Sequence, residues 1–132
     1  MKPTRVALVP CLMIQRDPVT GAFTIHRTVG SFRASRFPAV MQELSVYICI
    51  TGMHWPSDFR LDLVAPDETV LASDSFRIEK ADPLRFEEYA ATLRDIRIPE
   101  MGFNSLILYC DSETGHLDEI LIKLTMTSLE VG

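Results

Sequence analysis

Four side chains that can stack or form hydrogen bonds lie in expected loops: His54, Trp55, Glu113 and His116. A tryptophan ring between a histidine and a proline is amphipathic and carries one donor, and such rings are enriched at recognition surfaces. Histidine donors and a carboxylate acceptor would suit a polar ring compound such as a sugar or a base. We therefore predict a ligand-binding site that contains these four residues.

Two other interpretations of these loops stay open. In the first, the ring of Trp55 folds back and plugs the open end of the core. In the second, the chain is a small enzyme whose active site is assembled from loops around His54, Trp55 and His116. The P-loop, GxGxxG, HExxH, GxSxG and EF-hand patterns are all missing from the sequence. We therefore assign no catalytic residue and favour a non-catalytic binding or assembly module that acts through one loop end or a sheet edge.

The cysteines and histidines lack the spacing of a metal or redox site. Each cysteine falls inside an apolar, strand-like run: Cys11, Cys49 and Cys110. No CxxC pair or Cys/His cluster occurs, and His26 lies in mid-strand, too far away to join His54 and His116 at a loop end. We expect three reduced and buried thiols that act as small hydrophobic side chains, with no metal and no cofactor.

Charge and hydropathy bear on partners and location. The net charge of −5 argues against a nucleic-acid binder, which usually carries a basic patch. Residues 1–40 hold six basic residues and one acidic residue, but these are spread through expected strands. The apolar run Val6–Ile14 is too short to span a membrane, and Pro10 stands where a signal peptide would need a small residue. We expect a soluble, cytoplasmic protein with no membrane or nucleic-acid partner.

The elements that would position these side chains are short strands. Runs rich in Val, Ile, Leu, Phe and Thr alternate about every ten residues with Pro, Gly, Asp and Asn, a pattern typical of a sandwich or barrel. Phe59, Leu61 and Leu63 alternate with Arg60 and Asp62, as in a half-buried strand. Eight strands are expected near residues 6–15, 22–29, 43–51, 59–65, 70–78, 92–98, 105–110 and 117–127. We expect the 132 residues to form one domain, an all-β, antiparallel two-sheet β-sandwich.

Three details complete this prediction. Asp82 can cap a helix and Pro83 suits its first position, so a short helical turn is expected near residues 83–91. If the strands alternate in direction, every second connection lies at the same end, and one end gathers the four predicted site residues. Leu121 is the one apolar residue on the polar face of the last strand, and we expect it to face outward and support a homodimer.

The order of these features resembles a known family. The features are Phe37-Pro38 leading into a strand, the run from Phe59 to Leu63 ending at the Pro66-Asp67 turn, and Ile98-Pro99-Glu100-Met101-Gly102 before the penultimate strand. Together they resemble a family of small, uncharacterised bacterial β-sandwich proteins, which are domains of unknown function. The resemblance covers most of the chain. It implies a fold and no activity, so no functional residue is carried over.

Overall fold

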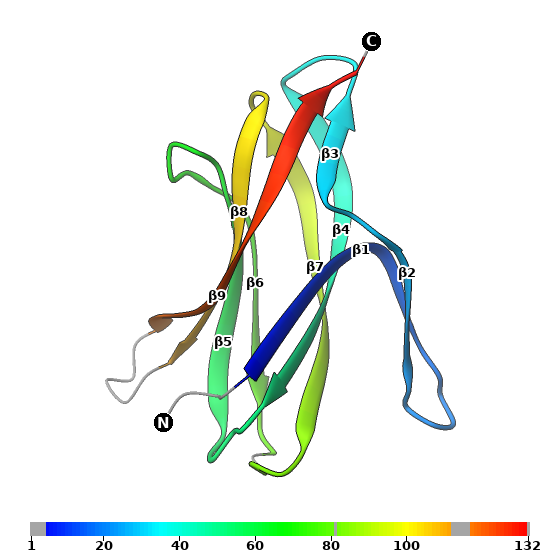
Figure 1. The fold of residues 1–132 in the computed structure, drawn as a ribbon, viewed down its shortest axis with the longest axis vertical. Coiled ribbons are helices and arrows are strands. Elements are labelled where there is room, and N and C mark those ends of the chain that lie inside the picture. Colours follow the sequence, from blue (N-terminus) through cyan, green and yellow to red (C-terminus); the bar gives the residue numbers. More distant parts are fainter. Residues whose placement is uncertain (1–4, 81, 112–116, 132) are drawn as a thin grey trace.

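The structure is a computed structural model that describes residues 5–80, 82–111 and 117–131. Within these residues the fold is all-β, and nine strands form two sheets that face each other (Figure 1). The strands are β1 (Arg5–Arg16), β2 (Phe23–Thr28), β3 (Ser31–Ala34), β4 (Ala39–Thr51), β5 (Ser57–Val64), β6 (Val70–Ile78), β7 (Phe86–Ile98), β8 (Gly102–Asp111) and β9 (Leu117–Glu130). The predicted all-β, two-sheet architecture is confirmed.

The two sheets differ in strand direction. Sheet A has the order β2-β1-β4-β7 and is antiparallel, whereas sheet B has the order β3-β9-β8-β5-β6 and is mixed because β3 runs parallel to β9. The prediction of an antiparallel sandwich holds for sheet A and fails in sheet B, where β3 is parallel to β9. Only Val29 and Gly30 separate β2 from β3, so one segment of chain passes from the edge of sheet A to the edge of sheet B.

The predicted helical turn near residues 83–91 is also wrong. Asp82 does cap a turn, since its side chain accepts a hydrogen bond from the backbone of Leu84 (2.9 Å) and its carbonyl accepts one from Arg85 (3.1 Å). From Phe86 onward, however, the chain is strand β7, which pairs with β4 from Phe86 to Ile98 with a gap at Asp95. Extended pairing with a central strand outweighs a weak local preference for helix.

The core lies between the sheets and is densely filled in the half of the molecule where β4 ends. Phe59 on β5 is fully buried and stacks on Phe76, with ring centroids 5.1 Å apart. Phe76 in turn stacks on Tyr89 of β7 at 4.0 Å, which joins the edges of the two sheets. Every second residue of β4 faces this core and has no exposed surface: Leu44, Val46, Ile48 and Ile50.

The thiols and Leu121 depart from the predicted pattern. None of the three cysteines forms a disulfide, but only Cys11 and Cys110 are buried, while Cys49 is partly exposed. In β9 the register shifts so that Leu108 faces Ile122 and Tyr109 faces Ile120, which leaves Leu121 as an extra residue between two pairs. Leu121 packs partly buried against the core. The prediction that it faces outward is wrong, and the homodimer remains a prediction without this support.

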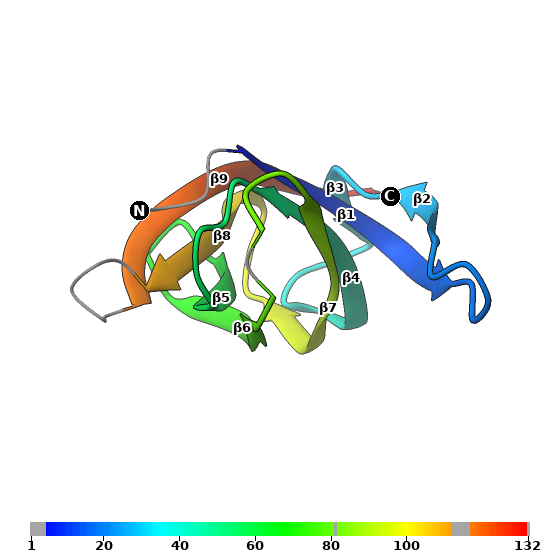
Figure 2. The ribbon, with the colours of Figure 1, turned by 90° about the horizontal axis from the view of Figure 1, so that it is seen from below.

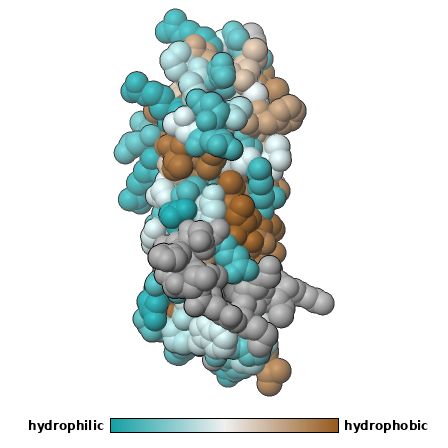
Figure 3. Space-filling model, turned by 90° about the vertical axis from the view of Figure 1, so that its left-hand side faces the viewer, coloured by the Kyte–Doolittle hydropathy of each residue, from teal (hydrophilic) through white to brown (hydrophobic). Residues whose placement is uncertain are grey.

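The surface on the side opposite the β1–β2 hairpin mixes hydrophilic and hydrophobic groups (Figure 3). Figure 3 shows hydrophobic groups gathered at mid-height on this side, with hydrophilic groups above them. Among the described residues, no helix is long and apolar enough to cross a membrane.

Candidate functional site

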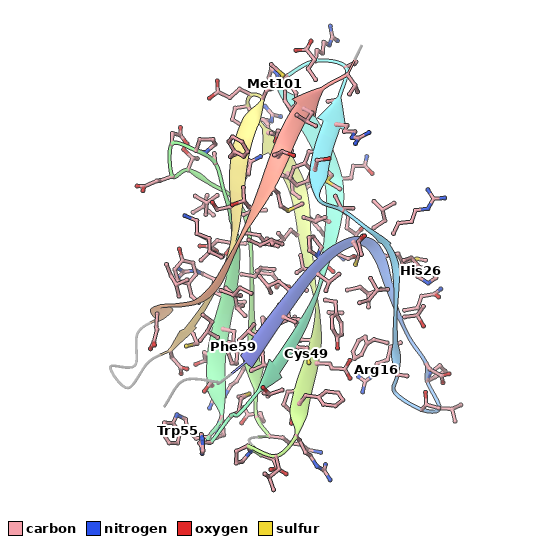
Figure 4. The ribbon with its side chains drawn as sticks, in the orientation of Figure 1. Arg16, His26, Cys49, Trp55, Phe59 and Met101 are labelled. Carbon is pink, nitrogen blue, oxygen red and sulfur yellow. The ribbon has the colours of Figure 1, made fainter. Side chains whose placement is uncertain are left out.

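The predicted loop-end site is only half within the described part of the chain. His54 and Trp55 lie in the connection from β4 to β5, at one end of the sandwich (Figure 4). Their ring centroids are 6.2 Å apart, and the Trp55 carbonyl accepts a hydrogen bond from the Ser57 hydroxyl (3.2 Å). Glu113 and His116 lie outside the described residues. The four-residue site therefore stays a prediction.

The end of the core next to these loops is closed by another residue. Met53 is 2% exposed and belongs to the core cluster, whereas Trp55 is 47% exposed. The hydrophobic plug at this end is therefore Met53. The ring of Trp55 is accessible, as the predicted ligand contact requires.

A second candidate site arises because β1 pairs with only part of β4. The pairing ends at Cys11, opposite Ser45, and beyond this point β1 pairs with β2 alone. β4 extends beyond the same point from Leu44 to Ala39, where its paired strand is β7. Figures 1 and 2 show the consequence: the β1–β2 hairpin leaves the sandwich and projects to one side. One edge of β4 is uncovered there.

An apolar groove occupies this gap and has a volume of about 310 Å³. Phe32 of β3 and Ile98 of β7 lie deep in it, with 6% and 2% of their surface exposed. Leu12 and Val40 are also part of the lining and are 48% and 65% exposed. The remaining lining residues are Val29, Ser31, Arg33, Ala34, Phe37, Ala39 and Met41. The groove thus leads from solvent to core residues of both sheets.

The charged residues nearest to the groove are arginines. Arg33 is part of the lining, Arg36 precedes Phe37 in the connection from β3 to β4, and Arg97 pairs opposite Val40. All three are exposed, and none forms an ion pair with another described residue. The groove therefore combines an apolar interior with a positively charged surround.

A second crevice lies under the far end of the hairpin and differs in chemistry. It has a volume of about 270 Å³ and is lined by Ile14, Arg16, Phe23, Glu88, Tyr89 and Ala90. Phe23 of β2 contacts the ring of Tyr47 edge-on at 5.8 Å, and the Arg16 guanidinium lies 5.5 Å from the centre of the Phe23 ring. The Tyr47 hydroxyl donates a hydrogen bond to the Glu88 carboxylate. We name this site the hairpin crevice.

The electrostatics of the hairpin crevice indicate a structural contact. Burial raises the pKa of Tyr47 above its ordinary value, and the hydrogen bond to Glu88 raises it further. The phenol therefore stays protonated at neutral pH and keeps donating to Glu88. Because Phe23 packs on the same ring, the arrangement holds the far end of the hairpin against β4.

Metal chemistry has no visible basis in the described part of the chain, where no group of three or more His, Cys, Asp or Glu residues is placed to hold an ion. His26 instead has its Nε2 2.8 Å from Oε1 of Gln15 on the neighbouring strand.

Sequence reasoning missed the groove because it missed β3. The segment Ser31–Ala34 is only four residues long and follows β2 almost directly, so it carries no turn signal of its own. The sequence matches no protein-family model, and no curated protein is significantly similar to it. The resemblance to bacterial β-sandwich proteins therefore stays a prediction, and the choice of site rests on geometry.

Proposed function

We propose that this protein is a non-catalytic binding module whose site is the apolar groove at the edges of the two sheets. The observation that carries the proposal is the exposure of a continuous apolar path from Leu12 and Val40 to the nearly buried Phe32 and Ile98. Ligand pockets are typically concave, mainly apolar and supplied with a few polar groups, and they have volumes of about 300–1,000 Å³. The groove fits the lower end of this range.

The size of the groove favours a small apolar group over an extended surface. An open edge between two sheets would otherwise leave apolar side chains in water, at a cost of about 25 cal/mol per Å². A ligand chain that covers Leu12, Val40 and the partly buried Met41 would remove this cost. We place the module in the cytoplasm, because its three cysteines form no disulfide and structural disulfides are rare in that compartment.

The test titrates the protein with uncharged alkanols from pentanol to nonanol. Binding is measured from the changes in the NMR chemical shifts of the backbone amides. Each added methylene should tighten binding by about 0.8 kcal/mol, or about fourfold, until the groove is full. The largest shifts should fall in β3 and in residues 39–44 of β4.

A matched pair of variants tests the location. Ala34 lines the groove, so Ala34→Phe should fill it and abolish alkanol binding. Ala7 is exposed on β1 and is not part of the lining, so Ala7→Phe adds the same side chain elsewhere and should leave binding unchanged. Binding that does not saturate, or that survives Ala34→Phe in a folded protein, would contradict the proposed function.

A further inference from the structure

The charge next to the apolar groove is mostly positive, with one carboxylate among its strand neighbours. One lining residue is Arg33, and two further arginines, Arg36 and Arg97, are direct chain neighbours of lining residues. None of the lining residues or their direct chain neighbours is an aspartate or a glutamate. The acidic residue nearest by strand register is Glu130, which pairs opposite Ala34 on β9. The chain as a whole has a net charge of −5, so a local excess of arginine runs against its composition.

These arginines have no internal partner that would explain them. Three other described arginines are paired: Arg77 contacts Asp58 (3.1 Å) and Glu79 (2.8 Å), Arg60 contacts Asp62 (3.2 Å), and Arg85 contacts Asp82 (3.6 Å). Arg16, Arg27 and Arg94 form no ion pair with a described residue. No such pair forms at Arg33, Arg36 or Arg97 within the described residues. Their guanidinium groups are therefore available to an anion from outside the chain.

Two exposed arginines lie at the rim of the groove on different sheets, each next to a buried residue that faces the core, Phe32 or Ile98. Arg33 lies on β3 of sheet B, and Arg97 lies on β7 of sheet A, opposite the exposed Val40. Side chains directly opposite each other in an antiparallel pair are neighbours, so Arg97 lies near the Val40 side of the groove. A guanidinium binds a carboxylate through two parallel hydrogen bonds, which gives direction as well as attraction.

We propose that the ligand of the groove is a medium-chain fatty acid. Its aliphatic chain would lie against Phe32, Met41 and Ile98, and its carboxylate would be held at the rim by Arg33 and Arg97. This inference rests on the proposed function and adds the head group to it. The volume of about 310 Å³ admits one short chain and is too small for the two long chains of a membrane lipid.

The experiment compares nonanoate with nonanol, two probes with chains of equal length, by titration calorimetry on the intact chain. Nonanoate should bind more tightly than nonanol in low salt. The difference in affinity should shrink at higher salt, because salt screens the arginine charges at the rim of the groove. Arg33→Gln and Arg97→Gln should each weaken nonanoate binding about two- to fivefold, as expected for an exposed charge pair, and leave nonanol binding unchanged. Arg94→Gln is the control, because Arg94 is exposed on the same strand but pairs opposite Glu43.

The outcomes separate the two proposals. Equal binding of both probes, with no effect of Arg33→Gln or Arg97→Gln, would overturn the fatty-acid inference and leave the apolar binding module standing. Failure of both probes to bind would overturn both. A dimer mass in light scattering that Ala34→Phe reduces to a monomer mass would show that a second copy fills the groove, which would also overturn the fatty-acid inference.

Discussion

The two halves of β4 show how one strand changes the character of a sandwich. From Ser45 to Thr51 the strand lies between β1 and β7, and its inward side chains Ile48 and Ile50 are completely buried. From Ala39 to Leu44 its paired neighbour is β7; Leu44 is still completely buried, but Met41, which lines the groove, is only partly buried. Both halves have ordinary apolar strand sequence. The groove therefore exists because β1 departs, and no unusual residue is needed to form it.

Two strained residues mark the half of the sandwich where β1 departs. Arg27 and Asp95 both have φ of 53°, a conformation that is uncommon for residues other than glycine. Each interrupts the pairing of its strand. The residues on both sides of Arg27 pair with β1, and the residues on both sides of Asp95 pair with β4, but Arg27 and Asp95 are not themselves part of the register. Leu93 and Ile96 are both fully buried although they are three residues apart, because the backbone turns at Asp95. At such a turn the side chains that follow lie on the face of the sheet opposite to the one that regular alternation would give them.

The first prediction compares two phenylalanines, one in each half. Phe59→Ala removes a fully enclosed ring and should lower the free energy of unfolding by about 3–5 kcal/mol. Phe32→Ala should cost clearly less, because Phe32 borders the groove and the space it leaves opens to solvent instead of forming a closed cavity. Urea unfolding measures both. Equal losses would mean that the groove is closed in solution.

Sequence could predict the filled half much better than the open half. Strand β6 was predicted with its observed bounds, and the alternation of Phe59, Leu61 and Leu63 correctly placed all three in the core. The burial of these residues follows regular alternation, which requires only that one face of the sheet packs on the core. β3 and the groove depend on which distant strands pair and where that pairing ends. No single segment carries this information.

The candidate sites show the same division. Sequence reasoning found His54 and Trp55 from their chemistry, and the structure shows both exposed. It missed Phe32 and Ala34, since their value as groove residues comes from the departure of β1. The plug interpretation of Trp55 failed for a related reason: the neighbouring Met53 points into the core, and sequence could not fix which of the two does so.

The second prediction tests how the filled half is closed at its end. Met53→Ala should lower the free energy of unfolding by about 2–5 kcal/mol, the usual cost of removing a buried methionine side chain. Trp55→Ala should cost less, because almost half of the ring already faces solvent. Thermal and urea unfolding of both variants check this order. A larger loss for Trp55→Ala would restore the plug interpretation.

The last and smallest effect concerns the hairpin whose departure creates the groove. Its turn is held by Asp17, whose carboxylate accepts hydrogen bonds from the backbone of Val19 (2.8 Å) and Thr20 (3.1 Å). These bonds favour the charged form and lower the pKa of Asp17. The turn is therefore stabilised fully above the unfolded pKa of about 3.9, and this contribution is lost as pH falls through the lower folded value.

Asp17→Ala should accordingly speed hydrogen exchange at Val19 and Thr20 at neutral pH while hardly changing global unfolding, because the turn is fully exposed. Asp17→Asn is the control, since its amide oxygen can accept the same two bonds and should preserve most of the protection. Alkanol binding should be unchanged in both variants, because Val29, at the base of the hairpin, is held independently by a hydrogen bond to the Pro10 carbonyl (2.8 Å). If loosening the turn weakened alkanol binding, the groove would depend on the whole hairpin and not only on the point where β1 leaves β4.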